Sequence, residues 1–158
     1  GVNLNSVKSG PLVGTAPSSL PSGYHFVSGT NEQWIIGPNV NLDGADLSGM
    51  DLDGIDFSGI DLSGADLSAV KTGPLVGSAP ILSDTYKYKN INNEKWIIGP
   101  DVILDGANLS NTNLSGLNLS NINLSNINLS NTYGQIKGIP LSSNFHSRQF
   151  TSNVMSVP

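Results

Sequence analysis

The sequence contains no cysteine and few charged residues, and each of these features excludes some classes of function. Without thiols the chain can form neither a disulfide framework nor a thiolate metal site, an absence that is compatible with any redox compartment. Charged residues make up 12% of the chain and the net charge is −5, so the clustered lysines and arginines that phosphate binding requires are missing. We therefore do not expect nucleic acid as a partner.

Membrane spans and catalytic or metal-binding groups are missing as well. No apolar stretch approaches the roughly 18 residues of a spanning helix, so membrane insertion is not expected. The two histidines, His25 and His146, have no second histidine at ligand spacing. Asp51, Asp53 and Asp56 have the spacing of calcium-binding carboxylates, but the glutamate that ends an EF-hand loop is absent. We expect neither an enzyme nor a bound cofactor or metal.

The chain contains a long segment that occurs twice in tandem. Hydrophobic residues make up 37% of the sequence, which is too much for simple disorder. Val7 begins the first copy and Val70 the second, 63 residues later. The Trp-Ile-Ile-Gly-Pro motif recurs from Trp34 to Trp96 at a distance of 62, so one insertion or deletion separates the copies. Such repetition decides the architecture, because two modules in series need no single central core.

Alignment of the copies divides the chain into modules. The opening residues align with the end of the first module, so the chain is interpreted as a processed product or an excerpt of a longer array. The segments are residues 1–6, the tail of a preceding repeat block; residues 7–69, module one, with a hairpin or loop segment at 7–39 and pentapeptide coils at 40–69; residues 70–131, module two, with the same parts at 70–101 and 102–131; and residues 132–158, a degenerate third module or C-terminal cap.

Each module ends in a run of six five-residue repeats with leucine or phenylalanine at the third position. On a helix such a period would rotate the leucine by about 140° per repeat, and on a flat strand it would alternate the leucines between faces. The leucines can share one side only if the chain bends once per repeat. Glycine, serine, asparagine and aspartate at the fourth and fifth positions favour such turns. The pattern therefore predicts a coiled ribbon whose interior takes the first and third positions.

The residues expected in the core are the third positions of both runs and one tryptophan from each intervening segment: Leu42, Leu47, Leu52, Phe57, Leu62, Leu67, Leu104, Leu109, Leu114, Leu119, Leu124, Leu129, Trp34 and Trp96.

The two runs resemble the pentapeptide-repeat family, whose motif is Ala-Asp/Asn-Leu-X-X, over 60 of the 158 residues. The resemblance implies an all-β fold, a right-handed quadrilateral β-helix with four repeats per coil. The first position departs from the family pattern, because large residues such as Met50 and Ile55 replace the small alanine. The whole module also resembles tandem arrays in large repetitive surface or secreted proteins, which implies no known activity.

The segments between the runs, residues 7–39 and 70–101, follow a different pattern. Each begins with a Gly/Pro-punctuated stretch, which predicts a loop. A short aromatic run, a polar turn and the Trp-Ile-Ile-Gly-Pro motif then predict a β-hairpin. We expect each hairpin to pack against or bridge neighbouring coils. Alternatively the segment continues the solenoid irregularly, since a module of 62–63 residues is close to three coils of twenty.

Two surface features could carry a function. The first run holds seven of the twelve acids, Asp43, Asp46, Asp51, Asp53, Asp56, Asp61 and Asp66. Some pentapeptide-repeat proteins imitate duplex DNA and bind gyrase, so the resemblance implies an acidic binding face as one interpretation and a polar exterior as the other. The second run holds five Asn-Leu-Ser sequons, at Asn108, Asn113, Asn118, Asn123 and Asn128, which are candidate glycan acceptors in a secreted protein.

The favoured function is structural and non-enzymatic. The modules would belong to an elongated extracellular or surface fibre or stalk, and copies of the chain would associate head to tail or side by side into filaments. The alternative is a macromolecule-binding module that uses the acidic face in the manner of a gyrase-type DNA mimic.

Overall fold

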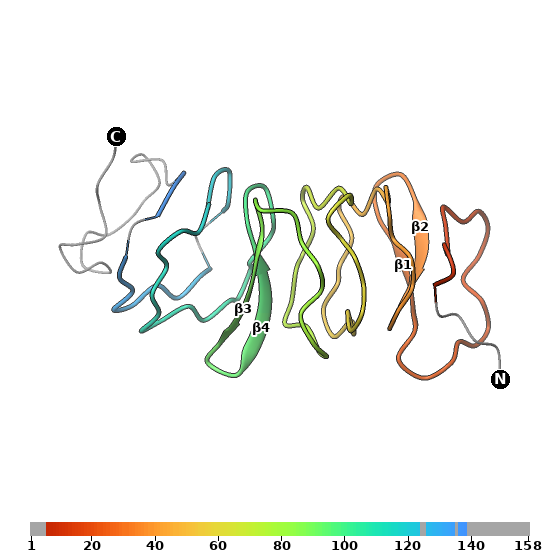
Figure 1. The fold of residues 1–158 in the computed structure, drawn as a ribbon, viewed down its shortest axis with the longest axis horizontal. Coiled ribbons are helices and arrows are strands. Elements are labelled where there is room, and N and C mark those ends of the chain that lie inside the picture. Colours follow the sequence, from red (N-terminus) through yellow and green to blue (C-terminus); the bar gives the residue numbers. More distant parts are fainter. Residues whose placement is uncertain (1–5, 124–125, 135, 139–158) are drawn as a thin grey trace.

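The computed structural model describes residues 6–123, 126–134 and 136–138, which form an elongated stack of turns laid side by side (Figure 1). The described part is all β, without helices. Consequently no helix in it is long and apolar enough to span a bilayer. The four strands are β1 (His25–Ser28), β2 (Gln33–Ile36), β3 (Lys87–Ile91) and β4 (Glu94–Ile98).

Outside these strands the chain is held by isolated parallel bridges between second-position residues. The bridges over the first run pair Asp46 with Asp66, Asp51 with Lys71, Asp56 with Val76 and Asp61 with Ile81. Each pair is twenty residues apart, so the chain returns to the same side after four pentapeptides. The second run repeats this spacing in Asn108 with Asn128 and Asn113 with Tyr133, and shortens it by one residue in Asn118 with Lys137.

The repeat bends because of its polar positions. The side-chain Oδ1 of the second residue accepts a hydrogen bond from the backbone N–H two residues later, an Asx turn. The described residues hold ten such bonds of 2.9–3.2 Å, accepted by Asn41, Asp46, Asp51, Asp56, Asp61, Asp66, Asn108, Asn113, Asn118 and Asn128. The fifth residue of most repeats has a positive φ, for example 71° at Gly54 and 57° at Asn111, with Gly64 as an exception. Glycine and asparagine tolerate this conformation, as the third residue of a type II turn requires.

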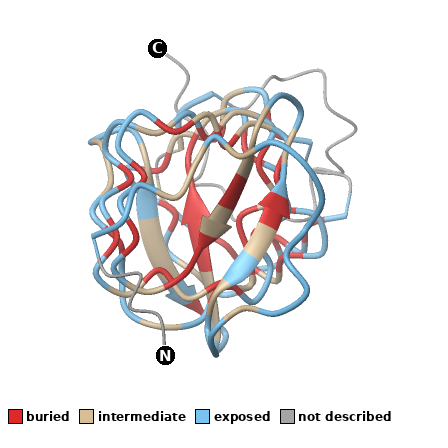
Figure 2. Ribbon diagram, turned by 90° about the vertical axis from the view of Figure 1, so that its right-hand side faces the viewer, coloured by how far each residue is buried: buried red, intermediate tan, exposed pale blue. Residues whose placement is uncertain are grey.

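The interior collects the third and first positions, while the polar positions stay outside (Figure 2). The buried third positions and tryptophans, none more than 2% exposed, are Leu42, Leu47, Leu52, Phe57, Leu62, Leu67, Leu104, Leu109, Leu114, Leu119, Leu129, Trp34 and Trp96. Leu124 lies outside the described residues. The large first-position side chains are also buried, at 1% exposure for Met50 and 2% for Ile55. The coil thus accommodates first positions larger than alanine.

Both predicted hairpins are confirmed. β1 pairs antiparallel with β2, from His25 opposite Ile36 to Ser28 opposite Gln33, and β3 pairs in the same way with β4. Asn92 and Asn93 connect β3 to β4 with φ values of 50° and 67°. Two consecutive positive φ values are typical of a type I′ turn, whose twist matches that of the strands it joins.

The Gly/Pro-rich stretch that begins the second insert contains no regular strand, but it is attached to the first run at regular intervals. Lys71, Val76 and Ile81 are spaced five residues apart and each forms a ladder bridge to the first run. Their N–H groups donate to carbonyl oxygens of that run at 2.9, 3.1 and 2.9 Å. A ladder bridge needs only backbone groups, so it forms without the Asp/Asn-Leu signature. These residues agree with the alternative interpretation, in which the segment continues the solenoid irregularly.

Candidate functional site

The first candidate site is the junction where the second insert meets the first run. The Nζ of Lys71 lies 3.2 Å from Oδ2 of Asp51 and 3.5 Å from Oδ2 of Asp53. The hydrogen bond to Asp51 raises the pKa of Lys71 against partial desolvation, and the charges of both carboxylates add to it. Because these carboxylates are 62% and 48% exposed, the ion pairs add little stability, about 1 kcal/mol or less.

A second contact at this junction centres on Gly77. Its carbonyl oxygen accepts hydrogen bonds from Nζ of Lys95 at 2.7 Å and from the hydroxyl of Tyr88 at 3.3 Å. A Cβ at this position would overlap Asp56 and Ser58 of the first run. Burial raises the pKa of Tyr88, and the negative charge of Asp56 raises it further. Gly77 is therefore held between the first run and the hairpin β3–β4.

The hairpin tips form the next contact, with the run that follows each of them. Thr30 N donates to the carbonyl of Ser48 at 3.0 Å, and Nδ2 of Asn31 donates to Oδ2 of Asp46 at 3.1 Å. Hydrogen bonds from Ser48 and Asn31 lower the pKa of Asp46. The second hairpin makes the equivalent contact, because Nδ2 of Asn92 donates to backbone carbonyls of the second run. Each insert is thereby tied to the run after it.

The acidic residues of the first run do not stack into one track. Asp43, Asp51, Asp53, Asp61 and Asp66 are exposed, and Asp46 and Asp56 are half-buried. Asp46 and Asp66 form the one bridge between two aspartates in the described ladder. The aspartates at 51, 56 and 61 lie beside Lys71, Val76 and Ile81 instead. The charges are therefore distributed around the coil and interrupted along it.

Comparison with known families decides what the runs are. The family model described as Pentapeptide repeats (8 copies) matches residues 40–71 and 101–131. The two runs belong to the pentapeptide-repeat family. The resemblance inferred from the sequence is thus confirmed, and the first match extends as far as Lys71, the first ladder residue of the second insert. Neither the comparison with curated proteins nor that with solved structures gave a match.

The sequons of the second pentapeptide run lie at the outer surface. Asn113, Asn123 and Asn128 are exposed, and Asn108 and Asn118 are half-buried. At Asn118 the sequon serine, Ser120, donates its hydroxyl to the asparagine Oδ1 at 2.7 Å. Oδ1 of Asn108, Asn113, Asn118 and Asn128 also accepts the Asx-turn bond. These asparagines therefore have a structural role whether or not they are modified.

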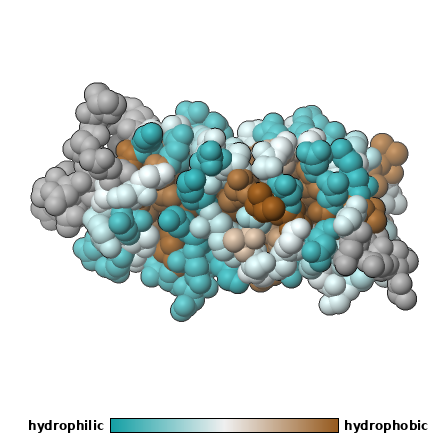
Figure 3. Space-filling view, viewed as in Figure 1, coloured by the Kyte–Doolittle hydropathy of each residue, from teal (hydrophilic) through white to brown (hydrophobic). Residues whose placement is uncertain are grey.

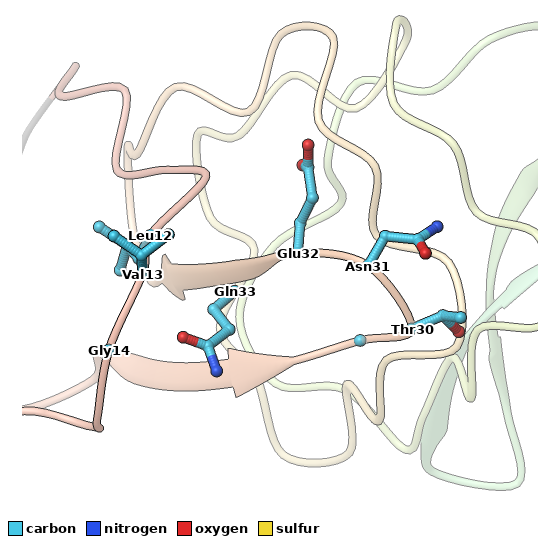
Figure 4. Close-up of a pocket in the computed structure, with 8 residues that line it drawn as sticks. Leu12, Val13, Gly14, Thr30, Asn31, Glu32 and Gln33 are labelled. Carbon is cyan, nitrogen blue, oxygen red and sulfur yellow. The ribbon is translucent and has the colours of Figure 1, made fainter.

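An open hollow lies beside the first hairpin (Figure 4). The N-terminal segment, with Leu12 and Val13, borders one side, and the hairpin tip, with Thr30 and Asn31, borders the other. Oε1 of Gln33 is buried here and has no hydrogen-bond partner. Sequence reasoning missed this hollow, because its residues belong to two separate predicted segments, the Gly/Pro-rich loop and the polar turn of the hairpin.

The described residues hold no group of three or more histidine, cysteine, aspartate or glutamate side chains that could hold a metal ion. His25 is exposed on β1, and His146 lies outside the described residues. The contacts that the structure does build are ladders, turns and junctions between repeats. Such an arrangement can support binding between surfaces.

Proposed function

We propose that this pentapeptide-repeat chain is a non-enzymatic structural protein whose modules add length to a fibre or stalk. The observation that carries the proposal is the junction at residues 71–81, where module two is built directly on the ladder of module one. Backbone hydrogen bonds and the Lys71 ion pairs join the modules without a free linker. Repetition of this junction lengthens the stack with little freedom to bend, as a stalk requires.

The form of coil that we propose is a right-handed quadrilateral β-helix. Four successive second positions, at 46, 51, 56 and 61, each bridge to a residue twenty positions later, which supports one bend per side of a four-sided coil. Right-handedness is supported by the general rule for crossovers between parallel strands. An experimental structure would test both features directly, and a left-handed coil would contradict the proposal.

Self-association is the second part of the proposal. At the N-terminal end of the described ladder Lys8 N and Val13 N have no backbone acceptor among the described residues, and low charge removes one of the usual barriers to edge pairing. Contacts that repeat head to tail without closing produce filaments. Light scattering and electron microscopy over a range of concentrations should therefore reveal uniform fibres. A monomer at every concentration would remove self-association and leave a simple stalk.

An extracellular or surface location would suit this role. The outward sequons of the second run support it, because such sites are glycan acceptors in secreted proteins. Mass spectrometry of the protein from its native source would test the location through glycans at Asn113 or Asn128. An unmodified, intracellular protein would contradict it.

A further inference from the structure

The two inserts have equivalent sequences but unequal surroundings. Val70 is fully buried beneath the first run, whereas its equivalent Val7 is 40% exposed. Val76 is 47% exposed, whereas its equivalent Val13 is 99% exposed. The space-filling view shows hydrophobic atoms at the N-terminal end of the stack (Figure 3). The first insert thus has a face that resembles the covered face of the second.

The backbone donors of this face differ in the same way. In the second insert Lys71 N donates to the carbonyl of Met50 at 2.9 Å, and Val76 N donates to that of Ile55 at 3.1 Å. Lys8 N and Val13 N, the equivalents in the first insert, have no such acceptor among the described residues. The N-terminal face therefore presents apolar side chains together with unpaired donors at ladder spacing.

The side chains around the hollow of Figure 4 complete the comparison. Gly77 leaves no room for a Cβ because Asp56 and Ser58 lie against it, whereas Gly14 has nothing within 4 Å of the same position. Lys95 binds the carbonyl of Gly77, whereas its equivalent Gln33 keeps a buried oxygen without a partner. Among the described residues, none fills over the first insert the space that the first run occupies over the second insert.

We propose that this N-terminal face accepts a coil of acidic pentapeptides of the first-run kind, which enters through Ser6. Ser6 has a φ of 60° and donates its N–H to Asn39 O at 2.6 Å. Ala69, the last residue of the first run, has a φ of 54° and donates to Asp101 O at 2.8 Å. Ser6 therefore has the conformation of the last residue of a pentapeptide.

The chemistry of the occupant follows from the covered copy. Its carbonyls would accept the N–H groups of Lys8 and Val13, and its aspartates would pair with the Lys8 ammonium as Asp51 and Asp53 pair with Lys71. A second copy of this chain is a poor source of that coil. Its first run is already covered by residues 71–81, and its second run has Asn113 and Ser115 at the two acidic positions.

The test is an extended chain in which residues 1–6 are replaced by a duplicate of residues 40–69 joined directly to Val7. Amide hydrogen exchange at Lys8 and Val13 should slow by about tenfold or more, toward the rates of Lys71 and Val76. Lysines at the duplicate's equivalents of Asp51 and Asp53 provide the matched control and should reduce this protection. If Lys8 and Val13 exchange as in the original chain while Lys71 stays protected, the proposal fails.

A pair of substitutions in the original chain keeps the proposal testable even if the extension does not fold. Val76→Asp should lower the thermal unfolding midpoint, and Val13→Asp should leave it unchanged. If both substitutions lowered the midpoint equally, the face of the first insert would not be an uncovered equivalent of the face of the second insert. The inference rests on the proposed structural function, but the two can fail separately. Protection of Lys8 in a chain that forms no fibres would support the covering coil and contradict filament formation. Fibres formed without protection of Lys8 would support filament formation and contradict the covering coil.

Discussion

The two pentapeptide runs build the same turn from different side chains. The first run uses aspartate at the second position, as in Asp46 and Asp51, with Asx-turn bonds of 2.9–3.0 Å. The second run uses asparagine, as in Asn108 and Asn113, with bonds of 2.9–3.2 Å. Because both side chains supply the same acceptor, the turn depends on an oxygen at that place and not on a negative charge.

The fifth position shows a related difference. The first run has glycine at five of its six fifth positions, whereas the second run has asparagine at four and glycine at two. The asparagine amides add bonds between successive coils: Nδ2 of Asn121 donates to Asp101 at 2.8 Å, and Nδ2 of Asn131 donates to Asn111 at 3.2 Å. The second run thus links successive coils through side chains at the fifth position, where the glycines of the first run have no side chain. Four changes would test how far the runs are interchangeable.

The largest effect is expected where the runs agree, in the core. Phe57→Asp would place an unpaired carboxylate at a fully buried position, and we expect a loss of at least about 4 kcal/mol in the free energy of unfolding. Ser63→Asp, at an exposed fourth position of the same run, should change it by less than about 0.5 kcal/mol. Urea unfolding measures both variants. Similar losses in the two would contradict a core built from third positions.

A smaller effect is expected at the fifth position. Gly54 has a φ of 71° and open space around it, so only backbone strain opposes a side chain there. Gly54→Val should cost about 1–2 kcal/mol, whereas Gly54→Asn, which copies the second run, should cost less than about 1 kcal/mol. The two unfolding midpoints in urea should therefore be ordered with the asparagine variant nearer the original protein. The reverse order would show that the fifth position is limited by packing.

The pentapeptide runs could be predicted from the sequence, but the ladder at the junction, residues 71–81, could not. Leucine or phenylalanine every five residues left one arrangement, a chain that bends once per repeat. At the junction the third positions are Thr72, Gly77 and Leu82, so the leucine signal is broken although the ladder continues. The first positions keep the period, because Val70 and Leu75 are both buried. Apolar residues at intervals of five were therefore the signal by which the junction could have been recognised. The glycines and prolines between them favoured the loop interpretation instead.

Acid should affect the two runs differently. Hydrogen bonds from Ser48 and Asn31 lower the pKa of Asp46, and hydrogen bonds from Ser63 lower that of Asp61. A lowered folded-state pKa stabilises the fold above the ordinary aspartate value of about 3.9, and this contribution is lost as the pH falls through the folded-state pKa. The joint change of Asp46 and Asp61 to asparagine should therefore reduce the drop in melting temperature between about pH 5 and pH 3. An unchanged drop would show that these carboxylates do not contribute to acid sensitivity.

The smallest effect is expected when the first run is given the second run's charge. Changing Asp46, Asp51, Asp56, Asp61 and Asp66 to asparagine retains every Asx-turn acceptor and removes the ion pair of Asp51 with Lys71. Since an exposed ion pair is worth about 1 kcal/mol or less, fold and assembly should persist with a loss of that size.

The same variant tests the acidic-face alternative. A DNA mimic needs a continuous negative track, and its binding to a basic partner weakens steeply with salt. The ladder interrupts that track with Lys71, Val76 and Ile81. We therefore expect the unmodified chain to leave the supercoiling activity of gyrase unchanged. Inhibition by the unmodified chain that disappears in the asparagine variant would show that the charge difference between the runs is functional, and it would replace the structural role with the DNA-mimic alternative.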